Sequence, residues 1–161
     1  MAYEKYTNEV PLKSFAKELV RAGDYEDFLI ALPHDYFEEN LLHAFILASE
    51  KLPLDETIRR VESFLPFIDN WAVCDQFSVK SFGKHPSIIY PYLKKWMTSD
   101  HFYTRRFGVV NSMRFFLDDK FEQSMLDDVV AATTEDYYMQ MAVAWYFATA
   151  RAKQWSAAIS Y

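Results

Sequence analysis

Apolar residues recur with helical spacing along almost the whole chain, and the segments that carry this pattern are short. Glycine or proline separates several of them, at Gly23, Pro33, Pro53 and Pro66. No segment alternates apolar and polar residues between turn-forming pairs, as a half-buried strand does. The sequence therefore predicts an all-α protein of about nine or ten short helices joined by short connections.

Capping residues and prolines place the expected helices. We expect them over 11–20, 25–32, 35–49, 54–65, 70–77, 86–97, 100–115, 120–132 and 134–153, with a short start over 154–161. The expected caps are Asn70, then Ser99 or Asp100, then Thr134. Short helices with short connections form antiparallel pairs.

A faint recurrence along the chain supports stacked helix pairs. Trp71, Arg106 and Trp145 follow one another at intervals of 35 and 39 residues, near the ~40-residue period of HEAT-type repeats. We therefore expect one HEAT-like domain over residues 1–161, an α-solenoid of antiparallel helix pairs. Its concave face would be a binding surface.

Composition excludes several classes of protein. A chain of 161 residues can bury a core without covalent staples, and its lone cysteine, Cys74, excludes a disulfide framework and is expected to pack. The histidines lack paired metal-ligand spacing and no glycine-rich phosphate loop occurs, so we expect no metal and no cofactor. No apolar run approaches the ~18–20 residues that span a membrane. We expect a cytoplasmic monomer with no membrane partner.

The charge is unevenly distributed. The net charge is −6, yet residues 78–115 hold seven basic side chains and one acid, which leaves −12 for the rest. The basic residues are Lys80, Lys84, Lys94, Lys95, Arg105, Arg106 and Arg114. A basic segment in an acidic chain predicts one surface that meets an anionic partner.

Three side-chain patterns suggest chemistry, and each has a plainer interpretation. Trp71 and Asp75 are four residues apart and share a helix face, where a carboxylate beside an indole could bind a cation. Asp75 could equally cap a helix or form a salt bridge. Arg106 could clamp a phosphate or belong to a solvated face. Trp145 could be a platform for a ligand or a core residue.

Taken together, these patterns resemble the DNA alkylation repair family, the AlkD-type DNA glycosylases built from HEAT-like repeats. The resemblance rests on the W-x-x-x-D of Trp71 and Asp75, on Arg105 and Arg106 before an apolar helix, and on the YY-x-x-x-A-x-A-W run ending at Trp145. It covers about residues 11–153, and the segment 10–19 is also similar. Relative to the family, we expect a chain that is a few helices short at its N-terminus and ends soon after Trp145.

The resemblance implies an enzyme that hydrolyses the N-glycosidic bond of N3- and N7-alkylated purines in duplex DNA. It implies that Asp75 is catalytic, that Trp71 and Trp145 flank the lesion nucleotide, and that Arg106 contacts the DNA backbone. The neighbouring basic residues would add backbone contacts, and these are Arg105, Lys80, Lys84, Lys94 and Lys95.

This chemistry is feasible with few residues, because an alkylated purine is already cationic and leaves without an added proton. One carboxylate suffices to stabilise the sugar cation and to position water. Two alternatives stay open. The chain could be a non-catalytic helical-repeat protein that binds distorted or branched DNA, or a scaffold for protein interactions.

Overall fold

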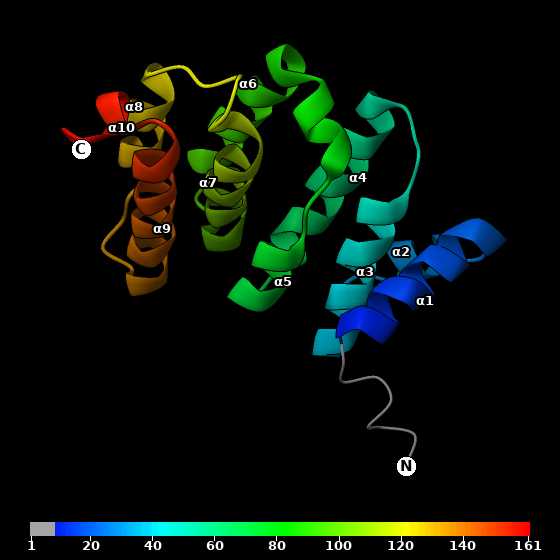
Figure 1. The fold of residues 1–161 in the computed structure, drawn as a ribbon. Coiled ribbons are helices and arrows are strands. Elements are labelled where there is room, and N and C mark those ends of the chain that lie inside the picture. The colour runs from blue at the N-terminus through cyan, green and yellow to red at the C-terminus, as the bar shows by residue number, and fades with distance from the viewer. Residues whose placement is uncertain (1–8) are drawn as a thin grey trace. The chain divides into compact units, whose positions relative to one another are not determined.

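The computed structural model of the chain describes residues 9–161, and these residues form helices without any strand (Figure 1). The α-helices are α1 (Glu9–Ala22), α2 (Glu26–Ile30), α3 (Phe37–Ser49), α4 (Leu54–Phe64), α5 (Trp71–Gln76), α6 (Pro86–Met97), α7 (Phe102–Phe116), α8 (Ser124–Ala131), α9 (Tyr137–Lys153) and α10 (Trp155–Ala158). Two 3-10 helices, η2 (Leu65–Phe67) and η3 (Lys80–Lys84), lie between them. The expected all-α class is confirmed.

The chain divides into two compact units, of which the first ends at Val79 and the second spans Lys80–Tyr161. In the first unit, α3 packs against α1, α4 and α5. In the second, α7 packs against α6 and α9, while α10 folds back on α9 and η3 contacts both α6 and α7. Each unit has its own apolar core, with Phe64 and Phe77 fully buried in the first and Phe107 and Tyr146 in the second.

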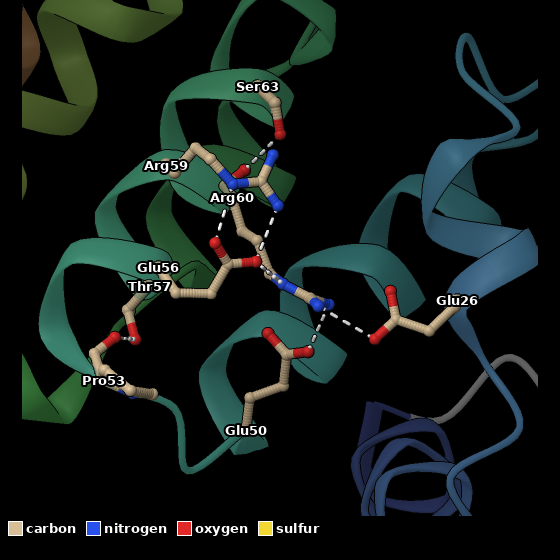
Figure 2. Close-up of polar contacts among 8 residues, drawn as sticks. All are labelled: Glu26, Glu50, Pro53, Glu56, Thr57, Arg59, Arg60 and Ser63. Carbon is tan, nitrogen blue, oxygen red and sulfur yellow. Dashed lines mark hydrogen bonds and ion pairs between the residues drawn. The ribbon is translucent and has the colours of Figure 1, made fainter.

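A single arginine joins three segments of the first unit (Figure 2). Arg60 on α4 donates from Nη1 to Glu50, just after α3, at 2.7 Å and from Nη2 to Glu26 on α2 at 2.9 Å. Its Nε donates to Glu56 on its own helix at 2.8 Å. Burial raises the pKa of Glu50, although Arg60 acts in the opposite direction. The network therefore connects α2 and the end of α3 to α4.

Close packing of α6 and α7 in the second unit depends on Gly108. A Cβ atom at this position would lie 2.9 Å from the backbone nitrogen of Met97 and 3.0 Å from the carbonyl oxygen of Leu93. Those distances are tighter than van der Waals contact, and backbone atoms cannot give way as a flexible side chain can. Glycine at this crossing therefore lets the two helices approach closely.

Several helix boundaries follow the sequence, and some do not. The span expected for α6 is confirmed, and Gly23, with a φ of +76°, ends α1 in the left-handed conformation that glycine favours. The cap of α7 is His101, not Ser99 or Asp100, because its Nδ1 accepts a hydrogen bond from the Thr104 N–H.

Two further helices start later than the sequence suggests. The helix α9 begins after Asp136, whose Oδ1 accepts from Tyr138 N–H at 2.8 Å, and not after Thr134. The helix α8 begins at Ser124, and not near residue 120. The HEAT-like solenoid and the single-domain organisation stay predictions. In the described part of the chain, no helix combines the length and the apolar character that crossing a bilayer requires.

Candidate functional site

The first candidate residues lie on α5, and the capping residue fixes where this helix starts. Asn70 has extended backbone angles, and its Oδ1 accepts a hydrogen bond from the Val73 N–H at 2.9 Å. Asparagine is a strong N-cap because it satisfies an N–H that has no partner within the helix. The expected cap is confirmed, and Trp71 is the first residue of α5.

Trp71 and Asp75 lie one turn apart on the less buried side of α5. The Trp71 side chain is 52% exposed and Asp75 is half-buried, whereas Val73 and Cys74 between them are fully buried. Residues four apart on a helix are neighbours. This face of α5 therefore offers a carboxylate next to an accessible indole, while Cys74 packs inside as expected.

The second tryptophan lies on a half-exposed face of α9 in the second unit. Trp145 is 44% exposed, and Met141 and Tyr137, one and two turns before it, are exposed as well. The next residue, Tyr146, is fully buried. Trp145 is therefore accessible to a partner and is not a core tryptophan.

Arg106 on α7 is largely buried. Only 6% of the residue is exposed, and its Nη1 donates to the carbonyl oxygen of Tyr138 in the first turn of α9. The guanidinium thus ties α7 to the start of the helix that carries Trp145.

The remaining basic candidates differ in their solvent exposure and in the partners that they already have. Lys80 and Lys84 on η3 are exposed, and so are Lys94 and Lys95 in the last turn of α6. Lys94 forms an ion pair with Asp128 at 3.0 Å. Arg105 is half-buried and donates from Nε to the carbonyl oxygen of Ser99 at 2.9 Å.

The two units carry opposite net charges. The chain up to Val79 contains seven basic and fifteen acidic side chains, a net charge of −8, and Lys80–Tyr161 contains ten basic and eight acidic ones, a net charge of +2. Trp71 and Asp75 belong to the acidic unit, and the basic candidates and Trp145 belong to the other. The structure therefore groups the candidates as two pairs, each described within its own unit: Trp71 with Asp75, and Arg106 with the helix of Trp145.

The first unit contains a stack of aromatic rings that no sequence pattern predicts. His34 Nε2 and His43 Nδ1 are 2.9 Å apart, and the two imidazoles lie between Phe28 and Phe64. The Phe28–His34 and His43–Phe64 ring centroids are 4.4 and 3.9 Å apart, with nearly parallel planes. Burial lowers the pKa of both histidines, that of His43 to about 3. Both imidazoles are therefore neutral near pH 7.

This stack predicts a loss of stability in mild acid. The unfolded chain binds a proton at His43 near its ordinary pKa of 6.5, and the folded chain does so only near 3, so unfolding takes up protons as the pH falls below 6.5. We expect the free energy of unfolding to fall by about 1 to 2 kcal/mol between pH 7 and pH 5. Denaturant titration measures it at each pH.

Matched variants show whether His43 causes this pH dependence of stability. His43→Phe should flatten the profile, because phenylalanine keeps a planar ring between the same neighbours and cannot take up a proton. His85→Gln, which changes the exposed residue before α6, should leave the profile as in the wild type. A profile for His43→Phe that is as steep as that of the wild type would contradict the assignment.

Two other observations concern possible ligands. Among residues 9–161, no three side chains of His, Cys, Asp or Glu come together in an arrangement that could hold a metal ion. A cleft of about 350 Å³ opens beside Trp71 in the first unit. No sequence pattern indicates this cleft, because its lining comes from two segments about thirty residues apart.

Comparison with known proteins gives one match. The family model described as "DNA alkylation repair enzyme" matches residues 3–156, which is nearly the whole chain. No curated protein and no solved structure matches. The family match supports an enzymatic role in DNA alkylation repair, with DNA as the partner. The chain therefore belongs to the DNA alkylation repair enzyme family.

Proposed function

We propose that this protein is a DNA glycosylase that excises N3- and N7-alkylated purines from duplex DNA. The observation that carries the proposal is the pair formed by Trp71 and Asp75 on one accessible face of α5, in a chain of this family. Trp145, exposed on α9, is the second tryptophan proposed to contact the lesion nucleotide.

The proposed reaction is hydrolysis at C1′ of the lesion nucleotide. The bond from C1′ to the purine nitrogen breaks, and its electron pair neutralises the charge of the alkylated ring, so the base needs no protonation to leave. The Asp75 carboxylate stabilises the cationic sugar as this bond breaks. It then accepts the proton of the water whose oxygen bonds to C1′. The indole of Trp71 favours a cationic nucleotide over a neutral one.

Contacts to the duplex come from the basic unit in this proposal. Lys80, Lys84, Lys94 and Lys95 are exposed and supply sequence-independent affinity for phosphates. Arg106 is buried, so it acts mainly by fixing the first turn of α9 and hence Trp145.

The proposal is tested by incubating the protein with methylated duplex DNA and separating the released bases by chromatography. We expect release of 7-methylguanine and 3-methyladenine above the spontaneous rate. Duplex affinity should fall with rising salt with a logarithmic slope of about −3, the value for three or four phosphate contacts.

Each other outcome points to a different function. Duplex binding with this salt dependence but without base release would indicate a non-catalytic DNA-binding protein. Absence of both release and salt-dependent binding would contradict a DNA function altogether, and a protein-interaction scaffold would then be the better interpretation.

A further inference from the structure

The cleft beside Trp71 lies wholly within the first unit, between the segment that leads into α3 and the start of α5. Its volume of about 350 Å³ is at the lower end of the range for small-molecule sites, which is about 300–1,000 Å³. Asp75 is not among its lining residues. The cleft is therefore a separate feature from the proposed catalytic carboxylate, and a small ligand fits it.

Three aromatic side chains give the cleft accessible ring surface. Tyr36, Phe37 and Trp71 line it, and all three are exposed. They come from two places in the chain, the start of α3 and the start of α5. Large rings that share one hollow and stay in water favour a ligand that covers them. Ring faces also attract cations, and quaternary ammonium groups in particular.

The charged groups of the cleft are acidic. Asp35 and Asp69 line it and are exposed, and among the residues that the structure describes neither lysine nor arginine does. His34 also lines it, and burial lowers the pKa of this histidine, so the imidazole adds no positive charge near pH 7. The unit around the cleft has a net charge of −8. These charges favour a free cation and oppose any ligand that carries phosphates, including a nucleotide of a duplex.

The helix start at the cleft does not change this preference. The Glu39 carboxylate turns back over the N-terminus of α3 and accepts hydrogen bonds from the Asp35 and Tyr36 N–H groups, both at 3.1 Å. These donors are therefore already satisfied, and a negative charge already offsets the positive end of the helix. The start of α3 thus gives the cleft no attraction for an anion.

A buried amide adds to the negative character of the cleft. Asn40 lines it and is only 6% exposed, and within residues 9–161 its Oδ1 accepts no hydrogen bond. Buried amide oxygens almost always have a partner. The partial negative charge of this oxygen is therefore not offset by a donor, and it adds to the attraction that the two carboxylates exert on a cation.

The aromatic lining decides which kind of cation fits. A primary ammonium is strongly hydrated and holds its water. Methyl groups on the nitrogen reduce this hydration and offer apolar contact area to the rings. The carboxylates of Asp35 and Asp69 are exposed and remain hydrated, so they attract a cation without replacing its water. The cleft therefore favours an alkylated ammonium over a primary one.

We propose that this cleft binds a small alkylated ammonium ion, held against Tyr36, Phe37 and Trp71 and attracted by the carboxylates of Asp35 and Asp69. A free cation of the choline type and the trimethylated side chain of a lysine present the same chemical group. Binding needs neither DNA nor Asp75, so the site does not depend on the proposed glycosylase activity.

NMR titration of the full chain with choline, and with its uncharged analogue in which carbon replaces the ammonium nitrogen, tests the proposal. The two molecules have nearly the same shape and differ in charge. At constant ionic strength we expect choline to bind about tenfold more tightly and to shift the indole N–H signal of Trp71. Equal affinities, or no binding of choline, would overturn the proposal.

Ethanolamine tests the preference for an alkylated nitrogen. Its primary ammonium has the charge of choline without the methyl groups, so it should bind more weakly than choline. Ethanolamine binding as tightly as choline would show that the carboxylates alone select the ligand, and it would overturn the assignment to an alkylated ammonium.

Matched variants locate the binding. Tyr36→Leu removes an exposed ring and keeps apolar bulk, so it should weaken choline binding about fivefold, whereas Tyr36→Phe keeps the ring and should bind as the wild type does. Asp35→Asn should weaken binding about threefold. Asp24→Asn, which removes an exposed carboxylate of the same unit outside the cleft, should not. Unchanged binding in both Tyr36→Leu and Asp35→Asn would overturn the proposal.

A peptide with one trimethyllysine, beside the same peptide with unmodified lysine, distinguishes the two sources of the group. Tighter binding of the methylated peptide than of choline would support a protein side chain as the ligand, and the reverse would support a free cation. The result is separable from that of the proposed function. Choline binding without base release from methylated duplex would retain the site and remove the glycosylase, and base release without choline binding would do the opposite.

Discussion

Replacing Asp75 by asparagine should lower the rate of alkylpurine release by at least about 100-fold, the usual contribution of a group that accepts a proton in the reaction. An amide has nearly the shape of the carboxylate, but it carries no negative charge for the sugar cation and is a very weak acceptor for the proton of water. The side chain is half-buried on the surface of α5, so the fold should persist. Duplex affinity should persist too, because the exposed lysines belong to the other unit.

Single-turnover kinetics measures the rate of 7-methylguanine release. Duplex binding and circular dichroism, measured beside it, show whether the DNA affinity and the fold persist. Asp24→Asn is the matched control, since it removes one exposed carboxylate from the same acidic unit, between α1 and α2. The control separates loss of a specific group from a general change of charge. Release by Asp75→Asn at the rate of the Asp24→Asn protein would remove Asp75 from the mechanism.

The fold was accessible from sequence because its signals are local. Helical spacing of apolar residues, the Asn70 cap and the glycine after α1 each act within a few residues, and all three lie where the sequence places them. The errors are local too. His101 is an unusual cap, and it prevails because its ring nitrogen reaches both the N–H and the hydroxyl of Thr104.

The candidate site was predictable only as far as neighbouring residues decide it. The four-residue spacing is enough to place Trp71 and Asp75 on one face of α5. The position of Arg106 depends on burial of α7, since the residues from Arg106 to Met113 are all buried and no face of that stretch points to solvent. No spacing rule reveals such a helix, because its polar residues are buried together with the apolar ones, and Arg106 reaches the Tyr138 carbonyl oxygen on α9.

Contacts between distant segments could not be predicted from the sequence. His34 and His43 are nine residues apart and meet only because the chain turns between α2 and α3. The cleft joins the start of α3 to the start of α5, and its acidic and aromatic members look like ordinary surface residues in the sequence. Tertiary packing gives them their shared environment.

Replacing Arg60 by methionine should destabilise the protein by about 3 kcal/mol, because it leaves the carboxylate of Glu50 buried without its cationic partner. The Glu50 side chain is 3% exposed and that of Arg60 16% exposed, so water compensates little for the lost ion pair. Methionine keeps most of the apolar volume of the arginine stem. Arg59→Met is the matched control, since the Arg59 side chain is 66% exposed and pairs with Glu56 on the surface, and its stability should be close to that of the wild type.

A second substitution shows whether the unpaired charge is the cause (Figure 2). Glu50→Gln in the Arg60→Met protein removes the buried charge, so the double variant should regain part of the lost stability.

The buried carboxylate of Glu50 also makes the effect of Arg60→Met on stability depend on pH. Burial raises the pKa of Glu50 in the folded state, and loss of Arg60 removes an opposing influence, so the folded variant binds a proton more readily than its unfolded chain. The stability gap between the wild type and Arg60→Met should therefore narrow as the pH falls toward 5, as measured by denaturant unfolding. A gap that stays constant with pH, together with no recovery in the double variant, would mean that the arginine stabilises the unit by packing and not by its charge.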